Sequence, residues 1–219
     1  MNDYQRCISF WDSIFLDENS AVPQNSSSGN TALDDAIGWL SKDSECILDF
    51  GCGNGSLLFY CSLHGTKSHL GIDLSKQAII TAQRRTANMP CGDFEFRQGG
   101  LEILTDVPDM SYDAVILSNI IDNLYPDDAM KLLHACVRIL KEYGKIFVKL
   151  NPYITQEQII DWKIKTISGN LLDDGLLLWN QTTEQWRVLF QEHFSIIQEN
   201  EIYYPEHDQT NRVFHLMKY

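Results

Sequence analysis

The stretch LDFGCGNGS, residues 48–56, places three glycines directly after a short apolar run. The run CILDF (46–50) is typical of a buried strand, and SLLFYCSL (56–63) is typical of a helix. A glycine-rich turn between a strand and a helix lets a ligand approach the backbone closely. The turn alone leaves open a dinucleotide site, a site for another nucleotide-like cofactor, and an ordinary tight turn.

Two carboxylates separate these alternatives. The dinucleotide pattern requires a small residue three positions after Gly53, but here glycine comes at position 55. Asp49 would repel a pyrophosphate and would favour a ligand that carries an ammonium group. Asp73 ends the run SHLGID (68–73), where a carboxylate can accept hydrogen bonds from both hydroxyls of a ribose. The two residues predict a cationic ligand with a ribose and no phosphate, which fits S-adenosylmethionine.

Short strand-like runs alternate with helical patterns through residue 151, which predicts a parallel sheet with helices on both faces. The last two runs, FSIIQENEIYY and NRVFHLMKY, are separated by a short polar turn and predict an antiparallel hairpin. We therefore expect a single domain of four parts. These are an N-terminal helix and loop that is a candidate lid (1–30), a cofactor-binding core (31–151), a cap or insertion (152–192) and a terminal β-hairpin (193–219).

The order ILDFGCGNGSLL, GIDLS, YDAVILSNIIDNL and RILKEYGKIFV resembles the class I S-adenosylmethionine-dependent methyltransferases. The similarity covers roughly residues 30–151 and the terminal hairpin. It implies an α/β, Rossmann-like fold: a seven-stranded, mostly parallel sheet with an antiparallel last strand. It also implies an enzyme that uses S-adenosyl-L-methionine, releases S-adenosyl-L-homocysteine and needs no metal.

The resemblance also assigns cofactor contacts. Asp73 would hold the ribose hydroxyls, and Leu74 would flank the adenine. The methionine and ribose part would be lined by Asp49, Phe50, Gly51, Cys52, Gly53, Asn54 and Gly55, and bordered by Ser118 and Asn119. The family often has an acidic residue after its third strand, where this chain has Gly100, so the adenine contact is expected from Leu101 or Glu102. No catalytic residue is predicted.

Composition restricts the partners. The net charge of −13 disfavours nucleic acid and anionic membranes, although a local basic patch stays open. The six cysteines form no C-x-x-C pair and the six histidines have no ligand spacing, so we expect a reducing compartment and no metal site. The chain has no apolar run long enough for a membrane span, and a cytoplasmic protein is expected. The oligomeric state, monomer or homodimer, stays open.

The predicted function is methyl transfer to a small-molecule acceptor. Candidates for the acceptor side are Asp122, Asn123, Tyr125 and Tyr153. Three alternatives stay open: a methyltransferase acting on RNA or protein, a non-catalytic module that binds S-adenosylmethionine, and an NAD-dependent oxidoreductase. Tyr4 and Trp11 lie seven residues apart, which puts them on one face of the N-terminal helix, either packed on the domain or covering the cofactor.

Overall fold

The computed structural model of the chain describes residues 3–16 and 21–219. The start of the predicted N-terminal loop, residues 17–20, lies outside the described residues, as do residues 1–2. The predicted N-terminal helix is present as α1 (Asp3–Phe15).

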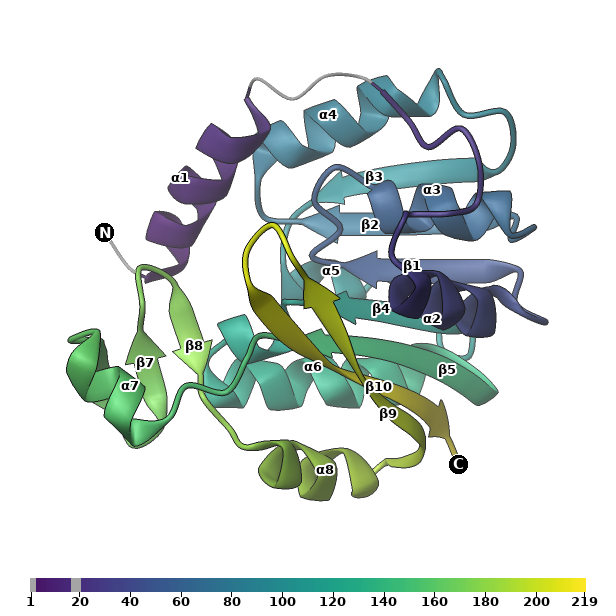
Figure 1. The fold of residues 1–219 in the computed structure, drawn as a ribbon. Helices are drawn as coiled ribbons and strands as arrows, with labels where there is room; N and C mark the ends of the chain where they lie inside the picture. The colour runs from purple at the N-terminus through teal and green to yellow at the C-terminus, as the bar shows by residue number, and fades with distance from the viewer. Residues whose placement is uncertain (1–2, 17–20) are drawn as a thin grey trace.

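Within the described residues, seven strands form one sheet in the order β3-β2-β1-β4-β5-β10-β9 (Figure 1). The strands are β1 (Cys46–Phe50), β2 (Ser68–Asp73), β3 (Asp93–Gln98), β4 (Tyr112–Ser118), β5 (Leu140–Leu150), β9 (Phe194–Tyr204) and β10 (Gln209–Lys218). The strands β1 to β5 pair in parallel, whereas β10 pairs antiparallel with both β5 and β9. The predicted mostly parallel sheet with an antiparallel last strand is confirmed.

Helices cover both faces of this sheet. They are α2 (Thr31–Ser41), α3 (Ser56–Leu63), α4 (Lys76–Thr86), α5 (Leu101–Leu104), α6 (Pro126–Ile139) and α8 (Thr183–Gln191). Because side chains alternate along a strand, Ile47 joins the core under α2, α3 and α4, whereas its neighbour Leu48 joins the core under α5, α6 and α8. On the second face Trp186 of α8 is fully buried.

A second, three-stranded sheet was not predicted. It contains β6 (Lys165–Ser168), β7 (Leu171–Asp173) and β8 (Leu177–Trp179), and α7 (Gln156–Asp161) precedes it. These strands have three or four residues each, too few to display a periodicity. Together with α8 they fill the range 152–192 that was expected to form a cap or insertion.

The boundary between α6 and β5 also differs from the prediction. The helical pattern of PDDAMKLLHACVRILK (126–141) predicts a helix to Lys141, and the run GKIFVKLN (144–151) predicts a strand from Gly144, but the helix ends at Ile139 and the strand begins at Leu140. The reason is strand pairing, because Leu140 already lies opposite Tyr112 of β4, with an irregularity before the ladder resumes at Lys145. Tyr143, in this irregular part, has a positive φ of 59°.

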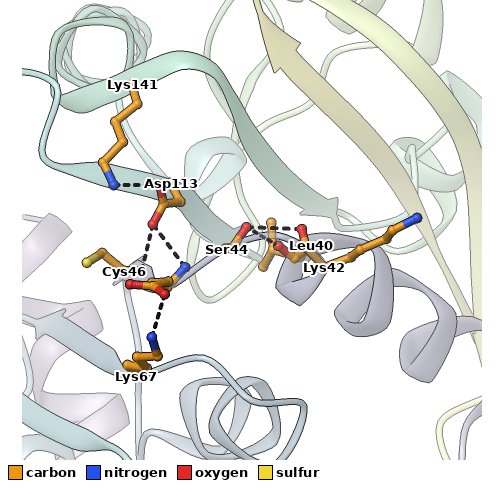
Figure 2. A network of polar contacts seen from close by, with 8 residues as sticks. Leu40, Lys42, Ser44, Cys46, Lys67, Asp113 and Lys141 are labelled. Atoms are coloured by element: carbon orange, nitrogen blue, oxygen red, sulfur yellow. Dashed lines mark hydrogen bonds and ion pairs between the residues drawn. The ribbon is translucent and has the colours of Figure 1, made fainter.

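Asp113 fastens together three strands at the end of the sheet opposite their carboxyl ends (Figure 2). Its carboxylate accepts hydrogen bonds from the backbone N–H groups of Glu45 and Cys46 at 2.9 and 2.8 Å and from Lys141 Nζ at 2.6 Å. The beginning of β1 is thereby held against β4 and β5. This contact fixes the relative position of the strands whose other ends carry the glycine turn and Ser118.

Candidate functional site

A cavity of about 350 Å³ lies at the carboxyl ends of β1, β2 and β4. Its floor comes from the turns that follow these strands and its roof from α1, which packs beside α4 and near β8 (Figure 1). Residues from both sides line it: Tyr4, Cys7, Ile8, Trp11, Phe15, Phe50, Gly51, Gly53, Ile72, Asp73, Leu74, Ser75, Gly99, Gly100, Leu101, Glu102, Ser118, Asn119, Ile120, Asn123, Leu124, Asp128 and Leu176.

The glycine turn has a conformation that other residues adopt poorly. Gly53 and Gly55 have φ values of +53° and +80°, in the left-handed region. A Cβ atom on Gly55 would lie 2.7 Å from Phe96 Cζ, and one on Gly53 would lie 3.0 Å from Phe15 Cζ. The two glycines therefore let the turn pack directly beneath α1 and against β3.

Asp73 joins the glycine turn to the end of β2. Its Oδ2 atom accepts a hydrogen bond from the Gly53 N–H at 2.8 Å, and its Oδ1 atom accepts one from the Ser75 N–H at 2.8 Å. Burial raises the pKa of the Asp73 carboxyl, and the two backbone hydrogen bonds oppose that shift. Because each carboxylate oxygen has a second lone pair, Asp73 can hold the turn and still accept hydrogen bonds from a diol.

Asp49 lies behind the turn and is only 1% exposed. Its Oδ1 atom is buried and has no hydrogen-bond partner among the described residues. Burial and then the neighbouring Asp73 raise the pKa of Asp49 well above its usual value, while Lys149 lowers it. A buried carboxylate oxygen without a partner fits a ligand that brings a positive charge to the turn.

Another wall of the cavity is formed by the residues that come directly after β3 in the chain. Glu102, in the first turn of α5, accepts a hydrogen bond from the Gly100 N–H at 2.7 Å through Oε1. A Cβ atom on Gly100 would lie 3.3 Å from Leu74 Cδ2. Because residue 100 is a glycine, a narrow space stays open between the turn after β2 and the turn after β3. The predicted adenine contacts thus lie on one wall of the cavity.

Asn119 follows β4 with a φ of 54°, and its side chain belongs to a chain of asparagine amides. It donates from Nδ2 to Asn151 Oδ1 at 3.2 Å and accepts at Oδ1 from Asn211 Nδ2 at 3.2 Å. Asn151 in turn donates from Nδ2 to Asp122 and to Asn123, at 3.1 Å each. The side-chain amide of Asn119 is therefore held by the scaffold at the edge of the cavity.

Asp122 is fully buried and does not line the cavity. Its Oδ2 atom accepts hydrogen bonds from the backbone and side chain of Asn151, whereas its Oδ1 atom has no partner among the described residues. Burial raises the pKa of Asp122 to about 6, although Asn151 and Arg212 oppose the shift. This carboxyl therefore titrates close to neutral pH.

Hydrogen bonds fasten the roof helix α1 to several other elements. Tyr4 Oη donates to Asp128 at 2.9 Å and accepts from the Tyr125 N–H at 3.0 Å, which ties α1 to α6. The guanidinium group of Arg6 forms two 3.0 Å hydrogen bonds to Asp173 in β7. Asp12 accepts hydrogen bonds from the Ser75 hydroxyl and the Gln77 N–H, at 2.6 and 3.1 Å. The helix therefore spans the cavity from the β4 side to the β2 side.

Ten of the predicted cofactor residues line the cavity and four do not. Asp49, Cys52, Asn54 and Gly55 lie outside its wall. Cys52 and Asp49 are buried behind the turn. The carbonyl of Asn54 instead accepts a 2.7 Å hydrogen bond from Arg85, whose guanidinium group also binds the Ser56 hydroxyl at 2.9 Å. Arg85 therefore anchors the end of the glycine turn.

The predictions for the acceptor side fall in different places. Asn123 lines the cavity, Asp122 is buried beneath it, and Tyr125 packs edge to face on Tyr4 with ring centroids 5.4 Å apart. Tyr153 is exposed and does not line the cavity. Both Tyr4 and Trp11 line it from α1, as their shared helix face predicted.

Sequence reasoning missed three residues that hold the site together: Asp12, Arg85 and Asn211. Each lies far along the chain from its hydrogen-bond partner. Local sequence patterns therefore do not relate these residues to the glycine turn. Among the described residues, no group of three or more histidine, cysteine, aspartate or glutamate side chains is arranged to hold a metal. Nor is any helix in the described ranges both long enough and apolar enough to cross a membrane.

Comparison with known proteins gives the family context. Residues 47–144 match a family model described as a methyltransferase domain. A ubiquinone biosynthesis O-methyltransferase of Neisseria meningitidis is 30% identical over 109 residues, which cover 48% of this chain and 45% of that enzyme. The chain thus spans less than half of that relative's length. A tRNA N(3)-methylcytidine methyltransferase of Schizosaccharomyces pombe is 26% identical over 163 residues, or 69% of this chain and 52% of that protein.

A solved structure extends the similarity to the whole fold. The magnesium protoporphyrin IX methyltransferase of Synechocystis PCC 6803, solved with bound SAM, superposes with a TM-score of 0.69 at 14% identity and covers 100% of this chain and 98% of that chain. The domain model and the strand order agree with this superposition. Residues 47–144 match the methyltransferase domain model, and the chain has the Rossmann-like fold seen in S-adenosylmethionine-dependent methyltransferases.

Proposed function

We propose that the protein transfers a methyl group from S-adenosyl-L-methionine to a small-molecule acceptor. The observation that carries the proposal is the position of Asp73, which lines the roofed cavity while both of its oxygens already order the surrounding turns. A carboxylate held in this way is preorganised to accept the hydroxyls of a ribose. When bound, the cofactor supplies a methyl group that its positive sulfur has already activated.

The residues of the chain would then bind the cofactor, orient it toward the acceptor and exclude water. Asp73 would hold the ribose, the wall at Gly100 and Leu101 the adenine, and Ser118 and Asn119 the methionine part. Asp49 would supply negative charge from behind the turn. Trp11 and Phe15, stacked with ring centroids 6.0 Å apart, form an apolar roof over the glycine turn. Positioning of two reactants in a dry cavity can contribute about 7 to 11 kcal/mol to catalysis.

The roof and the charge favour a small acceptor over RNA or protein. The cavity is closed on one side by α1, and the chain carries a net charge of −13, which opposes binding of a polyanion. The relative that modifies tRNA keeps an RNA acceptor as the second candidate. We also propose a cytoplasmic location and a single domain for the described chain.

Calorimetry and methyl transfer test the proposal. We expect S-adenosyl-L-homocysteine to bind with a Kd in the micromolar range, about −8 kcal/mol, and NADH not to bind, so that its fluorescence is not enhanced. Methyl-tritiated cofactor should label a small molecule in a metabolite extract. Labelling of only an RNA or protein fraction would refute the small-molecule acceptor, and cofactor binding without any transfer would support the non-catalytic alternative.

A further inference from the structure

The part of the cavity beside the carboxyl end of β4, two strands away from Asp73 at the end of β2, is the candidate acceptor half. We define it by six lining residues: Tyr4, Ile8, Asn123, Leu124, Asp128 and Leu176. Hydrogen bonds join its elements, since Tyr4 binds Asp128 and Asn123 Nδ2 donates to the Leu177 carbonyl at 2.6 Å. The acceptor half is therefore assembled from α1, the turn after β4, α6 and the β7–β8 hairpin.

The formally charged side chains on the cavity wall are all acidic. Its ionisable carboxyls are Asp73, Glu102 and Asp128, and within the described part of the chain no lysine, arginine or histidine lines it. Arg6 is the nearest basic residue on the roof, and its guanidinium group is bound to Asp173 by two hydrogen bonds. Apart from the sulfonium of the cofactor itself, an anionic acceptor would lose its water without meeting a cation on the wall, which is unfavourable.

The single carboxyl of the acceptor half already has partners. Asp128 Oδ1 accepts from Lys131 Nζ at 2.8 Å, and Oδ2 accepts from the Tyr4 hydroxyl at 2.9 Å. Because Lys131 balances its charge, Asp128 offers little attraction to a cationic acceptor. The remaining side chains are mainly apolar, and the amide of Asn123 is held between Asn151 and Leu177.

We propose that the acceptor half takes an uncharged, largely apolar small molecule and rejects anionic acceptors. The inference rests on the proposed methyltransferase function. The size of the cavity, about 350 Å³ for cofactor and acceptor together, lies at the lower end of the roughly 300 to 1,000 Å³ usual for ligand pockets, so the acceptor is compact. Because Lys131 balances Asp128 and no cationic side chain lines the described wall, we expect the acceptor to carry no charge.

Leu176 offers a direct test because it lines the acceptor half from the tip of the β7–β8 hairpin. Leu176→Lys would place a cation there, whereas Asp174→Asn makes the same change in net charge at an exposed residue of the same turn that does not line the cavity. Leu176→Gln controls for lost apolar contact. All three variants should bind S-adenosyl-L-homocysteine within about twofold of the wild type, since Leu176 belongs to the acceptor half and is not among the proposed cofactor contacts.

The experiment sorts methyl-tritiated products by charge. Wild-type protein is incubated with labelled cofactor and a metabolite extract, and the products are separated at pH 7 by anion and cation exchange. We expect label in the unretained, uncharged fraction, at least about tenfold less of it with Leu176→Lys, and wild-type amounts with Asp174→Asn. Leu176→Gln should fall between them.

Each other outcome decides the matter. Label retained on the anion exchanger, label only in RNA or protein, label on the cation exchanger beyond that of the unreacted cationic cofactor in a reaction without protein, or equal turnover by Leu176→Lys would overturn the assignment of an uncharged acceptor. Cofactor binding without label in any fraction would refute methyl transfer itself, and failure to bind S-adenosyl-L-homocysteine would refute the cofactor. The last two results identify failure of the proposed function rather than of the acceptor class alone.

Discussion

Replacement of Asp73 by asparagine is the most informative perturbation of the cofactor half. Two backbone donors, the N–H groups of Gly53 and Ser75, each require an oxygen acceptor at position 73. Asparagine supplies one oxygen, so one of these buried donors would face an amide NH2 group. The substitution also removes the negative charge that strengthens hydrogen bonds from ribose hydroxyls.

The size of the effect follows from these lost bonds. Hydrogen bonds to a charged group contribute about 1.5 to 3 kcal/mol each, and an unsatisfied buried donor costs about 1 to 3 kcal/mol. We therefore expect Asp73→Asn to weaken binding of S-adenosyl-L-homocysteine by about 2 to 4 kcal/mol, roughly 30- to 1,000-fold in Kd. Asp73→Glu keeps the charge and should lose less.

Isothermal calorimetry at neutral pH measures this change. Asp127→Asn is the matched control, because Asp127 is exposed at the start of α6 and does not line the cavity. Circular dichroism and urea denaturation establish that each variant is folded before titration. Binding by Asp73→Asn within threefold of the wild type would refute the role of this carboxylate, and an equal loss in Asp127→Asn would point to net charge instead.

Three further predictions concern Asp49, Asp122 and Tyr4. Because burial raises the pKa of Asp49, a cofactor ammonium should restore its charge and release a proton, so the binding enthalpy should depend on the ionisation enthalpy of the buffer. Asp49→Asn should abolish that dependence, and a wild type without it would contradict the expected ammonium contact. The pKa of Asp122 is raised to about 6 from its usual value, so its contribution to folding stability is present at low pH and is lost as the pH rises through about 6. Relative to Asp122→Asn, the wild type should gain about 1 to 1.5 kcal/mol in the free energy of unfolding between about pH 7 and pH 5, measured by urea denaturation; parallel pH profiles would disprove this. Tyr4→Phe removes the hydroxyl that donates to Asp128 and accepts from the Tyr125 N–H, a loss of about 1 to 3 kcal/mol, so amides of α1 should exchange with deuterium at least about tenfold faster; unchanged exchange would show that the roof does not depend on these contacts.

The mostly parallel sheet was predictable because it follows from local sequence. The runs ending at Phe50, Asp73 and Ser118 are apolar enough to identify buried parallel strands, and such strands place their carboxyl ends at one edge of the sheet. Asp73 could therefore be predicted to face the cavity from its position alone. The depth of Asp49 could not, because whether a side chain points into a cavity or behind it depends on neighbouring strands.

The roof was predictable only in part. The seven-residue spacing of Tyr4 and Trp11 indicated one helix face, but the hydrogen bonds of Asp12 and Tyr4 join residues more than sixty positions apart. Nothing in the local pattern indicates such partners. The hairpin that contributes Leu176 was missed for the same reason, since strands of three residues are stabilised by their contacts and not by their own periodicity.

The one-signed wall of the cavity has a consequence for turnover. S-adenosylmethionine carries one positive charge more than S-adenosylhomocysteine, because its sulfur is a sulfonium. A wall with Asp73 and Glu102 therefore favours the methylated cofactor over its demethylated product. The same charges that admit the cofactor thus assist in expelling what remains of it, so the site should resist inhibition by its own product.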